Sequence, residues 1–323
     1  MLIKAAVLHG IKDLRCEQVE LLEAQNDEDV ILVSASGICG SDVDRVYGKG
    51  AYHYPIVLGH EFSGYRKSNG KKAVVFPLIP CMKCAMCTIG EYAGCSDYSY
   101  YGSRRDGGFM EQIPIKNWNI IEAPDESDME SLAMAEPAAV ALHTADKLGI
   151  RAGYNILITG AGPIGVMLGQ WAKNMGAYKI YFTDIDSRKL DSVKDYGFFA
   201  YSGETVDAAV EGVGVSQTLA LCLEAVAPNG TLVLMGNPPG GINLTQKEYW
   251  HILRKQLTVK GTWNSTYNEF RNEWKLAVDA IASGLLDVKN LVSHRFALDD
   301  CTKAFELLHK REEFINRVMF TIS

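Results

Sequence analysis

The spacing of hydrophobic and polar positions changes along the 323-residue chain. In the first 140 residues, short apolar runs alternate with glycine-bounded or polar turns, which is typical of strands. The pattern predicts strands over 3–8, 30–36 and 73–76, with an apolar stretch over 55–64 that leads into another strand. Helix signals occur over 127–149, where Pro137 stands in a first-turn position.

From residue 154 the pattern changes to a regular alternation of apolar strands and amphipathic helices. This alternation predicts a parallel, doubly wound sheet with short connections. The expected strands are 156–159, 179–184, 206–210, 231–235 and 257–261, and the expected helices are 163–175, 187–195 and 217–227.

After about residue 266 the alternation ends. A helix over 269–283, a strand over 292–296, a helix over 299–309 and a strand over 317–322 are expected. We interpret this part as a return to the first domain. The predicted fold is therefore α/β, with a β-rich domain of residues 1–140 and 266–323 and an inserted nucleotide-binding domain of residues 141–265.

The inserted domain begins with a glycine turn between an apolar strand and a helix. Its glycines, Gly160, Gly162 and Gly165, have G-x-G-x-x-G spacing and enclose Ala161, Pro163 and Ile164. Such a turn places backbone N–H groups and a helix N-terminus against a pyrophosphate. Asp184 ends the next strand, 19 residues after Gly165, where a carboxylate can accept from ribose hydroxyls. The alternative is an ordinary glycine turn of another α/β sheet.

Asp184 also bears on the choice of cofactor. A carboxylate at this position repels a 2′-phosphate, so NAD is favoured over NADP. Arg188 and Lys189 follow closely and could weaken this preference, or they could simply be solvated residues in the first turn of the next helix.

Four of the eight cysteines are grouped as Cys81-x2-Cys84-x2-Cys87-x7-Cys95. Closely spaced thiolates of this kind let one loop surround a structural zinc ion. Free thiols or an iron–sulfur site are the alternatives. The other cysteines without a partner motif are expected to be packing residues; these are Cys16, Cys222 and Cys301.

A second potential metal set is dispersed in the sequence and comprises Cys39, His60, Glu61 and Glu136. One thiolate, one imidazole and one carboxylate would leave a coordination position open, as in catalytic zinc sites. Each residue also has an ordinary explanation: a core cysteine, a hydrogen-bonded histidine, or a glutamate that caps a helix.

The bulk properties exclude several classes of protein. A net charge of −7 argues against a general nucleic-acid binder, and no apolar run reaches the length needed to cross a bilayer. The first nine residues read as an edge strand rather than a signal peptide, so a cytoplasmic protein is expected.

Taken together, these motifs resemble the zinc-dependent medium-chain dehydrogenases over essentially the whole chain. The resemblance implies a GroES-like catalytic domain, a Rossmann domain and two zinc ions per subunit. It assigns the catalytic zinc to Cys39, His60 and Glu136, with Glu61 as an alternative ligand. The glutamate at position 136, in place of a cysteine, resembles the pattern of the polyol dehydrogenase branch of the family. The resemblance also implies a homodimer or homotetramer.

Within that branch, three stretches resemble dehydrogenases of sugar-alcohol phosphates: 54–65, 102–109 and 253–259. The middle stretch holds Arg104 and Arg105 in a glycine-rich loop, and guanidinium groups match phosphate oxygens. Their alternative is a surface ion pair with Asp106. The resemblance also implies that Arg45 and Lys255 line the substrate pocket. Shortened segments at 65–73 and 197–210 depart from the family pattern and make the shape of the pocket less predictable.

The expected reaction is oxidation of galactitol 1-phosphate to tagatose 6-phosphate with NAD. Ser41, two residues after Cys39, is expected to accept the alcohol proton, and the cofactor carries the hydride chemistry. The alternatives are a dehydrogenase of a free polyol or of threonine, and a zinc-stabilised NAD-binding protein without catalytic activity.

Overall fold

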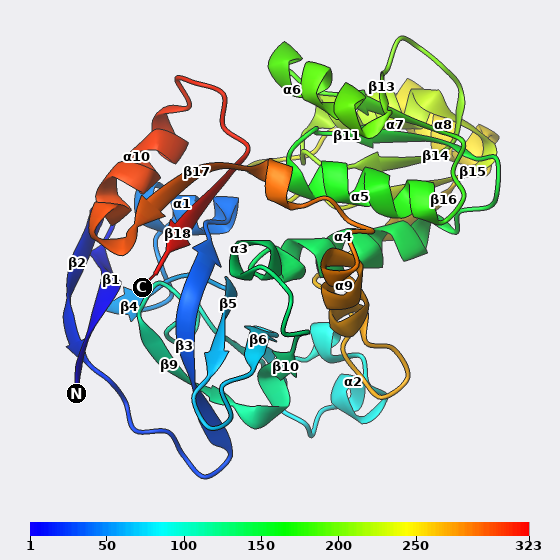
Figure 1. The fold of residues 1–323 in the computed structure, drawn as a ribbon. Coiled ribbons are helices and arrows are strands. Elements are labelled where there is room, and N and C mark those ends of the chain that lie inside the picture. Colours follow the sequence, from blue (N-terminus) through cyan, green and yellow to red (C-terminus); the bar gives the residue numbers. More distant parts are fainter. Residues whose placement is uncertain (323) are drawn as a thin grey trace. The chain divides into compact units, whose positions relative to one another are not determined.

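The computed structural model describes residues 1–322. The chain folds into two compact units (Figure 1). The first consists of Met1–Ala139 and the chain from Thr266 onward, and the second is Val140–Ser265.

The first unit is built mainly from antiparallel strands. Its largest sheet has seven strands in the order β10-β6-β5-β3-β18-β17, with β9 paired to β3, and a three-stranded sheet has the order β2-β1-β4. The strands are β1 (Leu2–Gly10), β2 (Asp13–Glu20), β3 (Glu28–Gly37), β4 (Ile56–Val57), β5 (Glu61–Arg66), β6 (Lys72–Val75), β7 (Leu78–Ile79), β8 (Ser99–Tyr100), β9 (Gln112–Lys116), β10 (Ile120–Glu122), β17 (Val292–Ala297) and β18 (Arg317–Thr321).

Short helices connect these strands, and apolar residues of β1, β3, β5, β18 and α10 form one core around Phe109, Phe305 and Phe320. The helices are α1 (Gly40–Tyr47), α2 (Ala85–Thr88), α3 (Met129–Leu132), α4 (Ala135–Leu148), which continues beyond the first unit, α9 (Glu273–Ala282) and α10 (Cys301–Lys310). The 3-10 turns are η1 (Tyr92–Gly94), η2 (Asn117–Asn119), η4 (Lys289–Leu291) and η5 (Leu298–Asp300).

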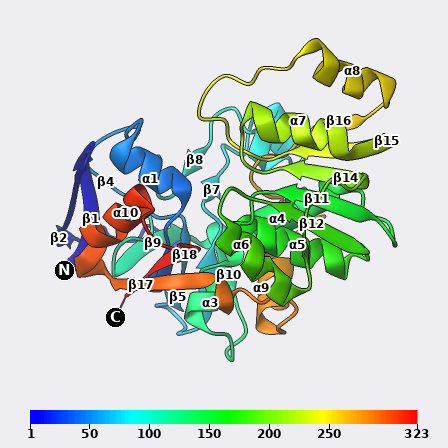
Figure 2. The same ribbon diagram turned by 90° about the horizontal axis from the view of Figure 1, so that it is seen from above.

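The second unit is a parallel six-stranded sheet in the order β13-β12-β11-β14-β15-β16. This is the strand order of a dinucleotide-binding fold. Helices α7 and α8 lie on one side of this sheet and α5 on the other (Figure 2). The strands are β11 (Asn155–Thr159), β12 (Lys179–Thr183), β13 (Phe199–Ala200), β14 (Val206–Glu211), β15 (Val226–Leu234) and β16 (Thr258–Gly261), and the helices are α5 (Pro163–Asn174), α6 (Ser187–Ser192), η3 (Val193–Tyr196), α7 (Ser216–Ala225) and α8 (Gln246–Arg254).

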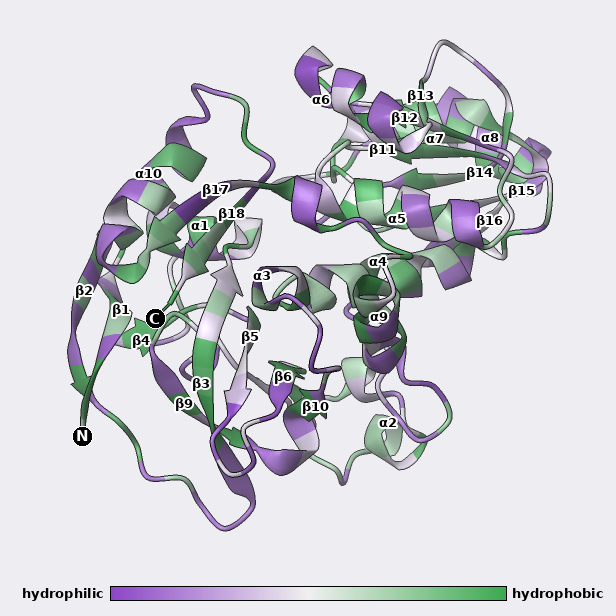
Figure 3. Ribbon diagram, in the orientation of Figure 1, coloured by the Kyte–Doolittle hydropathy of each residue, from purple (hydrophilic) through white to green (hydrophobic). Residues whose placement is uncertain are grey.

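The elements that the hydrophobic pattern predicted are mostly buried, and those that it did not predict are more exposed. The central strands β11, β12 and β14 are almost entirely buried, whereas α6 is largely hydrophilic (Figure 3). The hydrophobic pattern does not reveal strand β2, because most of its side chains are exposed or half-buried, nor α8, in which no residue is fully buried. None of the helices within residues 1–322 has the length and apolar character needed to cross a membrane.

Candidate functional site

Strand pairing brings Cys39, His60 and Glu61 together in the first unit. Strand β3 ends at Gly37, so that Cys39 becomes the N-cap residue of α1, and His60 directly precedes β5. Gly37 pairs with Glu61 across the antiparallel ladder. The thiol, imidazole and carboxylate atoms all lie within 4.8 Å of one another, although 21 or more residues separate Cys39 from the other two in the sequence.

The Asp42 carboxylate supports two members of this cluster. Its Oδ2 accepts a hydrogen bond from the Cys39 backbone N–H at 3.1 Å, and its Oδ1 lies 3.5 Å from Nδ1 of His60. Burial of the imidazole opposes its charged form, but the Asp42 and Cys39 charges outweigh burial and raise the pKa of His60 well above its ordinary value. A carboxylate behind a ligand histidine fixes the orientation of the ring. The sequence analysis did not single out Asp42, although it follows Ser41 directly.

Glu61 forms a buried ion pair with Arg317 of β18. Nη1 of Arg317 lies 2.9 Å from Oε2 of Glu61 and also donates to the Ile38 carbonyl at 2.9 Å. Burial opposes the charge of Arg317, yet the neighbouring Glu61 and Cys39 raise the pKa of its guanidinium. Because Arg317 lies 256 residues after Glu61, no local signal in the sequence could have identified it.

Glu136, in the first turn of α4, lies beside this cluster but is not part of its tight group. It is buried, and burial raises the pKa of its carboxyl to about 7, with the charges of His60 and Glu61 also acting on it. In this structure Glu61, the expected alternative ligand, belongs to the tight group with Cys39 and His60, whereas Glu136 does not. Tyr100 closes one side, with its ring edge-on to His60 at 5.9 Å.

Ser41 and Arg45 project from α1 next to the cluster. Nη1 of Arg45 donates to Oγ of Ser41 at 2.9 Å and lies 3.5 Å from Oδ1 of Asp42. A serine hydroxyl has two lone pairs and one proton. Ser41 therefore keeps one acceptor position and its own O–H for a substrate.

The cluster fits a zinc ion by the chemistry of its donors. A thiolate, an imidazole and a carboxylate are the usual protein ligands of catalytic zinc. Oε2 of Glu61 is buried beside Arg317, but within residues 1–322 it forms no hydrogen bond of good geometry. A metal ion would satisfy this oxygen, and because Nδ1 of His60 faces Asp42, Nε2 is the imidazole nitrogen left for a metal.

A second cluster unites Cys81, Cys84, Cys87 and Cys95, whose sulfur atoms all lie within 4.8 Å of one another. All are free thiols, and Sγ of Cys84 is 3.5 Å from Sγ of Cys87. Backbone N–H groups of Ser96 and Cys87 lower the pKa of Cys84 to about 6, which favours a thiolate. The arrangement fits a tetrahedral structural zinc.

The glycine turn of the second unit has the geometry needed for a dinucleotide. Gly160 has φ of +90° and a Cβ on Gly165 would lie 2.2 Å from the Gly160 carbonyl oxygen, so both positions require glycine. Gly162 is the N-cap residue of α5, its would-be Cβ has open space, and Pro163 and Ile164 start the helix. An approaching pyrophosphate would meet free N–H groups there.

Asp184 follows β12 and is linked to this turn. Its two oxygens accept hydrogen bonds from the backbone N–H groups of Ala161 at 2.8 Å and Asp186 at 2.9 Å. Arg188 is held by Asp186, to which its Nε and Nη2 donate at 2.9 and 2.8 Å. Arg188 is thus engaged with a carboxylate next to Asp184.

The four basic residues expected at the substrate pocket are dispersed. Lys255 is in the second unit, where its Nζ donates to the carbonyls of Leu223, Glu224 and Val226 at the end of α7. The Nζ group is thus engaged in a capping contact, and the expected substrate contact of Lys255 stays a prediction. Asp106 accepts a hydrogen bond from the Val57 N–H, and within residues 1–322 it forms no ion pair with an arginine.

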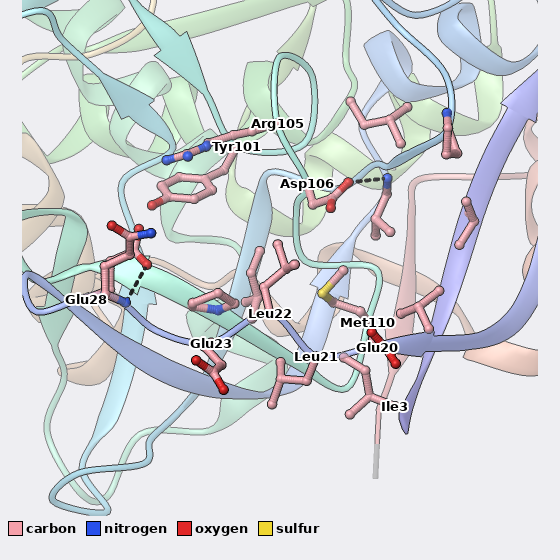
Figure 4. A pocket seen from close by; sticks show the side chains of 18 of the residues that line it. Ile3, Glu20, Leu21, Leu22, Glu23, Glu28, Tyr101, Arg105, Asp106 and Met110 are labelled. Carbon is pink, nitrogen blue, oxygen red and sulfur yellow. Dashed lines mark hydrogen bonds between the residues drawn. The ribbon is translucent and has the colours of Figure 1, made fainter. Parts of the chain in front are cut away.

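Arg104 and Arg105 both line a cavity of about 700 Å³ in the first unit. The guanidinium carbon of Arg105 lies over the Tyr101 ring, 5.3 Å from the centroid, at one side of this cavity (Figure 4). Ile3, Leu21 and Met110 form part of its apolar lining. None of the metal-cluster residues Cys39, His60 and Glu61 lines this cavity.

Comparison with known proteins places these sites in context. Family models match residues 25–125, described as an alcohol dehydrogenase GroES-like domain, and residues 163–283, described as a zinc-binding dehydrogenase. The chain is 34% identical to galactitol 1-phosphate 5-dehydrogenase of Escherichia coli (strain K12), over 86% of this chain and 88% of the relative. It is 29% identical to sorbitol dehydrogenase of Bombyx mori, over 94% of both chains. The crystal structure of galactitol-1-phosphate dehydrogenase from Escherichia coli superposes with a TM-score of 0.92 at 32% identity, covering 98% of this chain and 99% of that chain.

Proposed function

The chain belongs to the zinc-dependent medium-chain dehydrogenase family, and from this premise we propose that it oxidises a secondary hydroxyl of a sugar-alcohol phosphate with NAD. Galactitol 1-phosphate is the proposed substrate and tagatose 6-phosphate the product. The observation that carries the proposal is the buried Cys39, His60 and Glu61 cluster, with Ser41 beside it.

Zinc at this cluster would supply a Lewis acid for the substrate hydroxyl, and NAD would supply the hydride acceptor. Cys39, His60 and a glutamate would hold the ion; Glu61 lies within the tight group, and Glu136 is buried beside it as the other candidate for the third place. Cys81, Cys84, Cys87 and Cys95 would hold a second ion, which stabilises their lobe.

Residues around the cluster orient its side chains and balance their charges. Asp42 fixes the His60 ring, and Arg317 balances the charge of Glu61. Ser41 accepts the proton of the substrate hydroxyl as it donates its own proton onward, because its oxygen retains a free acceptor position beside Arg45. Correct alignment of these groups is the main contribution of the protein to the rate.

NAD rather than NADP is proposed from the second unit. Asp184 would meet the adenosine ribose, where a 2′-phosphate would be repelled. Arg188, the nearby cation that could have compensated, is engaged by Asp186. The cofactor would contact Gly160, Gly162, Pro163, Ile164 and Gly165 through their backbone.

The phosphate preference is supported by the similarity to galactitol 1-phosphate 5-dehydrogenase, while the similarity to sorbitol dehydrogenase keeps a free polyol as the alternative substrate. The test is NADH formation by zinc-loaded protein with galactitol 1-phosphate, galactitol, sorbitol and threonine, before and after removal of zinc. The proposal requires zinc-dependent activity that is highest with the phosphorylated polyol. Equal or better activity with a free polyol would overturn the phosphate assignment and retain the dehydrogenase.

A further inference from the structure

The glycine-rich loop after Tyr100 is fixed to the segment that carries His60. Gly107 donates to the Val57 carbonyl at 2.9 Å, and Gly108 donates to the Gly59 carbonyl at 2.8 Å. A Cβ on Gly107 would lie only 2.0 Å from the Gly59 oxygen. Because the loop packs directly on Gly59, its side chains have a defined position relative to His60.

The two adjacent arginines of this loop both line the cavity described above, but their guanidinium groups contact different rings. Arg105 lies over Tyr101 (Figure 4). Arg104 lies against two other rings, with its guanidinium carbon 4.6 Å from the centroid of Tyr52 and 4.5 Å from that of Tyr98. The prediction that both arginines form one phosphate site therefore has to be divided between them.

An unbroken series of aromatic contacts connects Arg104 with the metal cluster. The Tyr98 ring contacts Tyr100 edge-on at 6.4 Å, and Tyr100 contacts His60 edge-on at 5.9 Å. Arg104 is at one end of this row of rings and His60 is at the other. A polyol chain lying along the rings would place one end at the metal cluster and the other near Arg104.

The guanidinium of Arg104 is also available for an anion. Within residues 1–322, neither Arg104 nor Arg105 forms an ion pair with a carboxylate, so the row of rings toward His60 is what distinguishes Arg104 from Arg105. Arg45 is engaged by Ser41 and Asp42, and Lys255 by three carbonyls. Stacking between two rings uses the faces of the guanidinium plane and leaves its N–H groups at the edge free, which is the geometry for bidentate binding of phosphate.

We propose that Arg104 alone of the pair binds the phosphate of the substrate, clamped by Tyr52 and Tyr98, and that Arg105 takes no part. This inference rests on the proposed function and adds to it the residue that determines phosphate specificity. It also implies that the distance from Arg104 to the metal cluster selects which hydroxyl of the polyol is oxidised.

The test compares R104Q with the neighbouring variant R105Q as a matched control. For each zinc-loaded protein, kcat/KM is measured with galactitol 1-phosphate and with galactitol, and calorimetry gives the Kd of galactitol 1-phosphate without cofactor. R104Q is expected to lower kcat/KM for the phosphate ester about 100-fold, chiefly through KM, and to weaken its Kd in parallel. Activity with galactitol should change less than about threefold. R105Q should leave both substrates unaffected.

A lysine at position 104 gives a second control, because it retains the charge but not the planar, bidentate group. R104K is expected to recover part of the phosphate preference. If R104Q lowers kcat/KM equally for both substrates, or if R105Q instead lowers it selectively for the phosphate ester, the assignment of Arg104 is overturned. Wild-type protein that shows no preference for the phosphate ester would instead refute the proposed substrate, independently of either variant.

Discussion

Arg317 and Glu61 form a fully buried ion pair, 2.9 Å apart, directly beside Cys39 and His60. The pair joins β18 from the end of the chain to β5, which carries the metal cluster. Glu61 can therefore either remain paired with Arg317 or take part in holding a metal ion. The charge balance of the site depends on a residue far away in the sequence.

Replacement of Arg317 by methionine leaves the Glu61 carboxylate buried and unpaired. We expect the free energy of unfolding of the zinc-free protein to fall by about 3–5 kcal/mol, since breaking a buried pair leaves an uncompensated charge. The double variant E61Q/R317M removes both charges, and its free energy of unfolding should fall markedly less than that of R317M. Denaturant unfolding of the wild type, E61Q, R317M and the double variant measures this coupling, and simple additivity of E61Q and R317M would contradict it.

Replacement of Cys39 by serine removes the thiolate of the catalytic cluster. We expect NADH formation to be lost, and zinc content to fall by one ion per chain, while NAD still binds to the second unit. Metal analysis, activity and NAD titration check the three parts. C301S is the control, because Cys301 is buried in the core away from both metal clusters and should keep full zinc content. Wild-type-like turnover in C39S would refute the metal role.

Replacement of Cys95 by serine removes one thiolate of the four-cysteine cluster. The lobe 81–95 contains only short elements and few buried side chains, so a bound metal should provide most of its stability. We expect one zinc ion fewer per chain and cleavage within the lobe by a protease that spares the wild type. C16S serves as the control. A full zinc content in C95S would contradict the assignment.

Replacement of Asp184 by serine tests the cofactor preference. We expect the Kd for NAD to rise about tenfold and discrimination against NADP to shrink, because the carboxylate that repels a 2′-phosphate is removed. Titration with both cofactors checks this. D195N changes an exposed carboxylate of the same unit and should leave both affinities unchanged. Unaltered discrimination in D184S would refute the role of Asp184.

Replacement of Lys255 by methionine separates structure from substrate binding. Its Nζ satisfies three carbonyls at the end of α7, and burial lowers the pKa of this lysine. We expect the free energy of unfolding to fall by about 1–3 kcal/mol, since carbonyls lose their donor. KM for the sugar-alcohol phosphate should stay unchanged. A large rise in KM without loss of stability would restore Lys255 to the substrate pocket.

The sequence predicted the features that depend on local spacing. The glycine turn at Gly160 and the four-cysteine cluster each require particular residue types within a short segment, so a single sequence reveals them. The resemblance to the family then connected Cys39 with His60, whose proximity depends on the pairing of β3 and β5.

Features that depend on side-chain direction or on long-range contacts could not be predicted. The different ring contacts of Arg104 and Arg105 follow from the packing of their loop on Gly59, which periodicity does not encode. Arg317 reaches Glu61 only because β18 joins the sheet of the first unit. Lys255 was expected at a substrate pocket, but its position is determined by the end of α7.

The central claim, oxidation of a sugar-alcohol phosphate at the Cys39, His60 and Glu61 cluster, is tested most directly by steady-state NADH formation. Zinc-loaded wild-type protein should be compared on galactitol 1-phosphate and galactitol under identical conditions. We predict a kcat/KM at least about 100-fold higher for the phosphate ester, which corresponds to about 2.8 kcal/mol of additional transition-state binding. Equal values for the two substrates, or no NADH with either, would contradict the account.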